Sequence, residues 1–121
     1  MLTYAQKKYL FAIYTLSRKS EEVRSAEVAG FVGVSRASTV KMTQRLTDGG
    51  YIRKEPYGRI TLTDEGIKAA NSLFTDCLIL SDFLEKQAGV AHEKAASDAV
   101  TIMSRVSEET AEGLMRYILA R

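Results

Sequence analysis

Residues 34–46, which read VSRASTVKMTQRL, decide the fold of this chain. The segment opens with Ser35, a hydroxyl residue suited to capping a helix, and continues for several helical turns. Residues 25–32 read SAEVAGFV and predict a short helix upstream, and Gly33 with Val34 supplies a tight turn between the two. Two short helices joined in this way are typical of a helix-turn-helix, whose second helix lies in the major groove of DNA.

The second of these predicted helices carries both apolar and polar side chains. Val40, Met42 and Leu46 are apolar, whereas the other side chains can reach outward. The outward set comprises Arg36, Ser38, Thr39, Lys41, Gln44 and Arg45. Because this set mixes phosphate binders with side chains that can donate to base edges, the segment predicts DNA binding.

Two β-rich runs follow this motif directly. Residues 51–54 and 59–62 read YIRK and RITL, and they flank residues 55–58, which include Pro56, the one proline of the chain. This pattern predicts a β-hairpin. Because it follows the helix-turn-helix, the hairpin is expected to be the wing of a winged helix.

Helical patterns cover most of the remaining chain. Residues 3–17 carry an apolar stripe at helical spacing, and Ser25 is suited to capping the helix that follows. Thr63 is expected to cap a long apolar helix that runs to about residue 87. Further helices are predicted over about 92–103 and from Ser107 onward.

The predicted fold class is therefore mainly α. A winged helix-turn-helix DNA-binding domain is expected over residues 1–66, followed by an all-helical dimerisation domain over residues 67–121. Residues 1–62 hold 11 Lys and Arg against 5 Asp and Glu, a net charge of +6, whereas residues 63–121 hold 6 against 10, a net charge of −4. This division indicates that the first half meets a polyanion and the second does not.

Composition limits the class of protein and the cellular compartment that we expect. No apolar run approaches the ~18 residues that a membrane helix needs, and the start, MLTYAQKKYL, lacks the pattern of a secretory signal. Cys77 is the one cysteine, so it forms no internal disulfide and fits a reducing compartment. We expect a cytoplasmic protein without a membrane partner.

Four segments resemble the diphtheria-toxin-repressor family of metal-dependent regulators, most closely its short manganese-sensing (MntR) branch. They are YLFAIYTL at 9–16, RSAEVAGFVGVSRASTVKMTQRL at 24–46, YIRKEPYGRITLTDEG at 51–66 and LSDFLEKQAGV at 80–90. The resemblance is strong in the N-terminal segments and moderate in the last one, which matches the start of the family's dimerisation region.

The resemblance implies a set of DNA-binding residues. Residues 35–45 would read the groove, which adds Ser35 and Ala37 to the outward set, and Tyr57 with Arg59 would approach phosphate or the minor groove from the wing. Ser25 would touch the DNA backbone at the start of its helix, where free N–H groups favour anions. For Ser25 and Ser35 simple capping is the alternative, and both roles can coexist.

The resemblance also implies six effector positions, at which this chain differs from its relatives. Relatives hold Mn²⁺ or Fe²⁺ with Asp, Glu and His, which are hard or borderline donors. The corresponding positions here are Lys8, Phe11, Cys77, Val100, Met103 and Ser104. Only Cys77 is a strong metal donor, and His92, the only histidine, lies outside this set. We therefore expect no metal ligands and no metal cofactor.

The apolar side chains at several of these six positions suggest how the protein could act without manganese or iron. Burying Phe11, Val100 or Met103 contributes roughly 1.5–3 kcal/mol each. We hypothesise that they form a hydrophobic plug that keeps the protein permanently competent for DNA. Three alternatives remain open: an apolar small-molecule effector, a redox signal at Cys77, and a metal at a non-standard site.

An enzyme is not expected, because no paired carboxylates and no nucleophile with a nearby base can be recognised. A winged helix used only for protein contacts is the alternative from another class. Retention of the basic side chains favours DNA over that alternative. These are Arg36, Lys41, Arg45, Arg53, Lys54 and Arg59.

The expected partners are a double-stranded, palindromic DNA operator and a second copy of the chain. Two recognition helices about 34 Å apart, or a multiple of that, would read a two-fold operator. The expected regulatory role is that of a repressor. The apolar candidates for the homodimer interface are Leu73, Leu80, Leu84, Ile102, Leu114 and Ile118.

Overall fold

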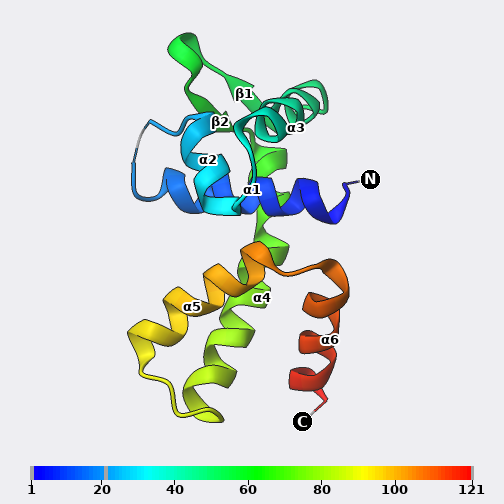
Figure 1. Cartoon of the computed structure of the whole chain (residues 1–121). Helices are drawn as coiled ribbons and strands as arrows, with labels where there is room; N and C mark the ends of the chain where they lie inside the picture. Colours follow the sequence, from blue (N-terminus) through cyan, green and yellow to red (C-terminus); the bar gives the residue numbers. More distant parts are fainter. Residues whose placement is uncertain (1, 21, 121) are drawn as a thin grey trace. The chain divides into compact units, whose positions relative to one another are not determined.

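The computed structural model describes residues 2–20 and 22–120. Its elements, labelled in Figure 1, confirm the mainly α fold class with a small hairpin. They are α1 (Tyr4–Ser17), α2 (Ser25–Val32), α3 (Arg36–Asp48), β1 (Ile52–Lys54), the short 3₁₀ helix η1 (Pro56–Gly58), β2 (Ile60–Leu62), α4 (Asp64–Lys86), α5 (His92–Arg105) and α6 (Glu108–Leu119). The chain divides into two compact units, Met1–Asn71 (unit 1) and Ser72–Arg121 (unit 2), so the division falls within α4. The domain boundary placed at residue 66 from the sequence stays a prediction.

Hydroxyl side chains start four of these helices, because they satisfy backbone N–H groups that have no partner within the helix. Thr3 accepts from the backbone N–H of Gln6 at 3.1 Å, and the Gln6 side chain accepts in turn from the Thr3 N–H at 2.8 Å. Ser35 and Ser107 cap α3 and α6 by accepting from residues three positions on, at 3.1 and 3.2 Å. The predicted caps at Ser35 and Thr63 are confirmed, since Thr63 accepts from the backbone N–H of Gly66 at 3.2 Å at the start of α4.

The prediction that Ser25 caps α2 is wrong. Arg24 is the N-cap residue, with an extended backbone (φ −125°, ψ 163°), and Ser25 is already helical. The backbone N–H of Arg24 donates to a carboxylate oxygen of Glu27 at 3.1 Å. An acidic side chain in the first turn is favourable there, because the helix dipole is positive at this end.

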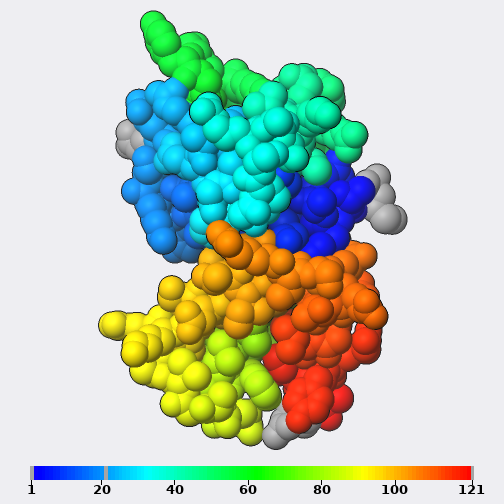
Figure 2. All heavy atoms as spheres, viewed as in Figure 1, coloured from blue at the N-terminus to red at the C-terminus, as the bar shows by residue number. Residues whose placement is uncertain are grey.

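The two-stranded hairpin Ile52–Leu62, here called the wing, is antiparallel and pairs Ile52 with Leu62 and Lys54 with Ile60. Its predicted turn contains η1, which the sequence did not predict. Figure 2 shows the tip of the wing projecting from the rest of unit 1.

The core of unit 1 is made of α1, α2, the inner face of α3 and the two strands. Buried side chains from all of these elements form one cluster, and α1 contacts α2, α3 and β2. The central members are Leu10, Ile13, Val23, Val28, Leu46, Ile52 and Ile60. A shared core of this kind fixes the helix-turn-helix and the base of the wing in one rigid arrangement.

Unit 2 contains most of α4 together with α5 and α6. Its buried side chains include Leu73, Leu80, Ala95 and Ala99, and the rings of Phe83 on α4 and Tyr117 on α6 meet edge to face with centroids 6.3 Å apart. No helix within residues 2–20 and 22–120 combines the length and apolar character needed to cross a bilayer.

Gly66, in the first turn of α4, provides a test of the packing between the start of α4 and the hairpin in unit 1. A Cβ added there would collide with the carbonyl oxygen of Tyr51 and would lie 2.9 Å from Leu62 Cδ2. Neither can yield easily, because Tyr51 O belongs to the backbone and accepts from the Thr63 N–H at 3.1 Å. We expect Gly66→Ala to lower the free energy of unfolding by about 1–3 kcal/mol, as overpacking does, in chemical denaturation.

Gly30→Ala is the matched control, because nothing lies within 4 Å of a Cβ at this position inside α2. Alanine is the better helix former, so this variant should gain about 0.5–1 kcal/mol. Equal stability of the two variants would contradict the packing described for the start of α4.

Candidate nucleic-acid interface

The inner face of α3 determines which of its side chains are available to a ligand. Thr39, Thr43 and Leu46 are fully buried at helical spacing. The two threonine hydroxyls are satisfied within the helix, since Thr39 Oγ1 donates to the Ser35 carbonyl and Thr43 Oγ1 to the Val40 carbonyl, each at 3.0 Å. The threonines can therefore pack like small apolar residues without leaving a buried polar group unpaired.

The opposite face of α3 is open to solvent. Ala37, Val40, Lys41 and Gln44 are exposed at spacings of three and four residues, which places them in one stripe along the helix. Arg36, Ser38 and Arg45 are also exposed and lie beside this stripe. The face thus combines cationic, amide and apolar side chains on a rigid, well-packed helix, which suits contacts to both phosphates and base edges.

Two sequence expectations on α3 require correction. Thr39 was expected to reach outward, but its side chain is fully buried, and its hydroxyl is satisfied there by the carbonyl of Ser35 in the preceding turn. Val40 was grouped with the apolar residues and not with the outward set, yet it is 50% exposed. The signal that could have revealed both is periodicity, since Thr39, Thr43 and Leu46 follow an i, i+4, i+7 pattern that leaves Val40 outside.

The remaining predicted contacts around α3 occupy different settings. Ser35 is exposed, and its hydroxyl lies 3.0 Å from that of Ser38, so the two form a small polar group at the start of α3. Gln44 is exposed, and its amide donates to Asp48 at 2.9 Å. Ser25 is half-buried in the first turn of α2. The DNA contacts of these residues stay predictions.

The wing carries an exposed aromatic side chain among basic ones. Tyr57 is 92% exposed at the tip, and its backbone is left-handed with φ +65°. Arg53 and Lys54 on β1 are exposed, whereas Arg59 is half-buried. The Arg53 guanidinium lies 3.8 Å from the Glu55 carboxylate, an exposed pair of small energetic weight.

The six predicted effector residues belong to two different units. Lys8 and Phe11 lie on α1 in unit 1, and burial lowers the pKa of the Lys8 ammonium. In unit 2, Met103 is fully buried, Val100 is half-buried, and the Ser104 hydroxyl is used within α5, where it donates to the Val100 carbonyl at 2.6 Å.

Cys77 is a buried thiol on α4. Its Sγ lies 3.9 Å from the Ala99 carbonyl, and burial, helped by the charge of Asp76, raises the pKa of the thiol to about 12. At neutral pH the thiolate is therefore scarcely populated. Because the thiolate is the reactive and metal-binding form, Cys77 is poorly suited to redox sensing in this conformation.

These donors do not fit a hard divalent cation. An ammonium, a phenyl ring, an isopropyl group, a thioether, a protonated thiol and an engaged hydroxyl occupy the six predicted positions, whereas Mn²⁺ favours carboxylate and imidazole ligands. Across residues 2–20 and 22–120 no three His, Cys, Asp or Glu side chains gather in a group that could hold a metal ion.

His92 begins α5 on the surface. Its Nδ1 lies 2.9 Å from a carboxylate oxygen of Glu85, and the hydrogen bond and charge of Glu85 raise the pKa of the imidazole. The pair links the end of α4 to the start of α5. This arrangement gives the His92–Glu85 pair a structural role.

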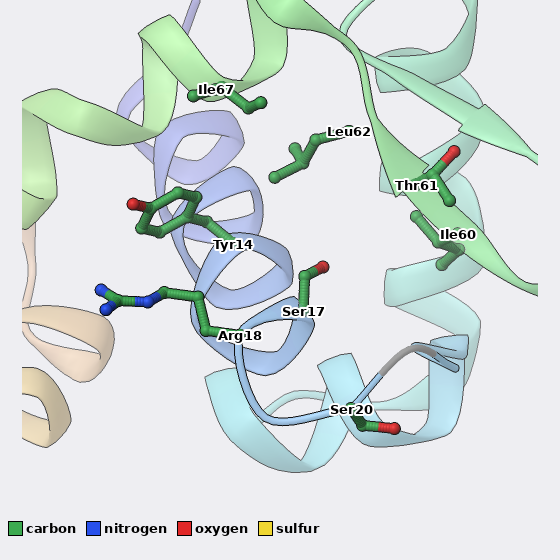
Figure 3. Close-up of a pocket in the computed structure, with 8 residues that line it drawn as sticks. All are labelled: Tyr14, Ser17, Arg18, Ser20, Ile60, Thr61, Leu62 and Ile67. Carbon is green, nitrogen blue, oxygen red and sulfur yellow. The ribbon is translucent and has the colours of Figure 1, made fainter.

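One cavity of about 310 Å³ lies on unit 1 between α1, β2 and the start of α4 (Figure 3). Tyr14, Leu62 and Ile67 form its apolar part, and the Arg18 guanidinium carbon lies 5.9 Å from the centre of the Tyr14 ring. None of the predicted DNA or effector residues lines it. The cavity is therefore separate from the exposed face of α3.

Comparison with known proteins finds a matching family model and several relatives. Residues 1–60 match the family model for the iron dependent repressor, N-terminal DNA binding domain. The transcriptional regulator MntR of Escherichia coli O6:H1 is 36% identical over 109 residues, which cover 90% of this chain and 70% of that relative. An uncharacterized HTH-type transcriptional regulator of Methanocaldococcus jannaschii is 26% identical over 115 residues, covering 95% of this chain and 89% of the relative.

The fold also matches a solved structure described as a manganese-dependent transcriptional repressor in complex with manganese. The TM-score is 0.68 with 26% identity, and the match covers 95% of this chain. This chain spans 51% of the length of that solved chain.

The same findings correct one prediction. We expected no metal cofactor, whereas the solved structure with 26% identity is described as a manganese-dependent transcriptional repressor in complex with manganese. The prediction of no cofactor was therefore wrong. It treated the loss of donors at six positions as the loss of metal dependence, although those positions do not determine which donors the rest of a protein supplies.

The relatives are transcriptional regulators, and the wing, the helix-turn-helix and the following helices occur here in the order the sequence predicted. The chain belongs to the diphtheria-toxin-repressor and MntR family of winged helix-turn-helix transcriptional regulators.

Proposed function

We propose that this regulator binds a specific double-stranded DNA operator as a homodimer and represses transcription from it, with α3 of each copy in the major groove. The observation that carries the proposal is the exposed stripe of α3, which is held outward by the buried Thr39, Thr43 and Leu46. A helix presented in this way needs no rearrangement to enter a groove about 12 Å wide.

The side chains of the stripe suit different parts of the groove. Lys41 and Arg36 are long cations suited to phosphate oxygens or to guanine edges, and Gln44 can form a paired hydrogen bond with adenine. Gln44 must then exchange its bond to Asp48 for one to the base. Ala37 and Val40 add apolar surface that can contact thymine methyl groups, so Val40 joins the predicted DNA-reading residues.

The wing supplies a second contact beside the helix. Tyr57 at its exposed tip and Arg59, which directly precedes β2, are proposed to meet the phosphate backbone or the minor groove. Contacts to phosphate fix the orientation of a protein on the duplex without reading sequence themselves.

The homodimer is proposed to form through unit 2. The sequence candidates Leu73 and Leu80 are buried in the core, so they are poor interface residues, whereas Leu84, Ile102, Leu114 and Ile118 are half-buried. The large apolar side chains left exposed in this unit are Leu78, Tyr117 and Leu119. Tyr117 and Leu119 lie on α6, near a shallow depression of about 190 Å³ lined partly by Phe83 and Ile118. Covering this surface with the same surface of a second copy gives a closed two-fold dimer.

A Lys41→Ala substitution tests the DNA interface. Loss of a phosphate or base contact should weaken binding to duplexes and lower the slope of log affinity against log salt by about one. Fluorescence anisotropy with a labelled genomic-fragment library, followed by a selected duplex, measures both quantities.

Lys68→Ala removes the same charge from the exposed surface of α4, where Lys68 pairs with Glu65 at 3.6 Å, and should leave the slope unchanged. The titrations need one series with Mn²⁺ and one with chelator, because the solved relative is described as manganese-dependent. Absence of DNA affinity at low salt in both series would overturn the proposal and favour a protein-contact module.

Tyr117→Glu tests the dimer surface. A carboxylate at a two-fold interface meets unfavourable desolvation and its own symmetry mate, so we expect the dimer dissociation constant to rise at least about tenfold. Analytical ultracentrifugation measures it. Thr101→Glu, at an exposed position on α5, is the control and should leave the dimer unchanged. If Tyr117→Glu dimerises as tightly as the parent chain, α6 is not the interface.

A further inference from the structure

We infer that Arg24 is a positioning residue that fixes the tip of the wing relative to the helix-turn-helix. The inference rests on the proposed function in one respect, since it assumes that the wing contacts DNA. Its structural part concerns unit 1 alone and can be tested without DNA.

The wing tip has an unusual backbone that requires stabilisation. Tyr57 (φ +65°, ψ 22°) and Gly58 (φ +77°) are both left-handed, and Tyr57 is the one non-glycine residue with positive φ among residues 2–20 and 22–120. A bulky residue adopts this conformation only where its surroundings hold it there. The ring of Tyr57 cannot provide that support, because it is 92% exposed.

Arg24 reaches this backbone from the start of α2, 33 residues away in sequence. Its Nη1 donates to the carbonyl oxygen of Tyr57, the residue with the disfavoured conformation. The same nitrogen lies 3.9 Å from where a Cβ on Gly58 would be, so the guanidinium spans both left-handed residues. The second nitrogen, Nη2, lies 3.5 Å from Glu22. A planar guanidinium can serve both partners at once, which an ammonium does less well.

Arg24 can hold the tip because its own backbone is fixed. Its N–H donates to Glu27, and its carbonyl oxygen accepts from the backbone N–H groups of Glu27 and Val28 at 3.1 and 3.2 Å. The preceding residue, Val23, is buried and accepts from the Ile60 N–H at 2.8 Å.

The segment before α2 therefore contacts the wing at two levels. Val23 joins its base through the β2 backbone, and Arg24 joins its tip through Tyr57. With both contacts in place, Tyr57 is presented in a fixed relation to α2 and to α3, which packs on α2. Without Arg24, the base would stay attached while the tip became free to leave the left-handed conformation.

The first experiment measures backbone order in the free protein by ¹⁵N relaxation. Arg24→Met keeps the apolar stem and removes the guanidinium. We expect the order parameters of residues 57–58 to fall below about 0.6 while those of α2 and α3 stay near 0.85. Lys19→Met, which removes one exposed charge from the turn after α1, should leave the tip unchanged. Unchanged order at the tip in Arg24→Met would overturn the inference.

The second experiment is a double-mutant cycle for DNA affinity with Arg24→Met and Tyr57→Ala. Each single variant should bind about fivefold more weakly, the effect of losing one hydrogen bond or contact, and the double variant should bind no more weakly than Tyr57→Ala. Additive losses would show that Arg24 contacts DNA directly and would overturn the positioning role. If the parent chain does not bind DNA, the proposed function fails, and the relaxation experiment still decides whether Arg24 orders the tip.

Discussion

The packing of α3 through Thr39, Thr43 and Leu46 determines which side chains this protein can offer to DNA. The directions of side chains around a helix are fixed relative to one another. Burial of these three residues therefore turns the opposite face to solvent, with Ala37, Val40, Lys41 and Gln44. The threonine hydroxyls allow this burial because the helix itself supplies their acceptors. A larger polar side chain in place of Thr39 or Thr43 would have to leave the core. The helix would then rotate or unpack, and its exposed face would no longer be presented in the same way.

The same core joins the reading helix to the wing. Leu46, Ile52 and Ile60 lie in one apolar cluster, and the segment before α2 bonds to β2 through Val23. Unit 1 therefore behaves as one body in which the two proposed DNA contacts, on α3 and on the wing, keep a constant separation, and Arg24 extends that order to the exposed tip. Preorganised contacts cost less entropy on binding than contacts that must be assembled, which suits a regulator that searches DNA for one operator.

Much of this architecture could be predicted from the sequence, because helix caps, turn residues and apolar periodicity are local signals. The orientation of α3 was predicted only in part, since threonine reads as polar although Thr39 and Thr43 are buried. The cap at Arg24 and the backbone of Tyr57 depend on Glu27 and on a contact across 33 residues, which local patterns do not reveal. The cofactor prediction failed for a further reason: substitutions at six positions describe those positions, and metal dependence is a property of the whole protein.

The most direct test of the exposed face of α3 is an NMR titration of the ¹⁵N-labelled chain with a short duplex at low salt, run once with a diamagnetic divalent ion and once with chelator. We expect the largest amide shift changes at residues 36–45 and at the wing tip, residues 57–59, with much smaller changes along α5. Changes confined to unit 2, or distributed evenly over both units, would contradict the claim that the exposed face of α3 binds DNA.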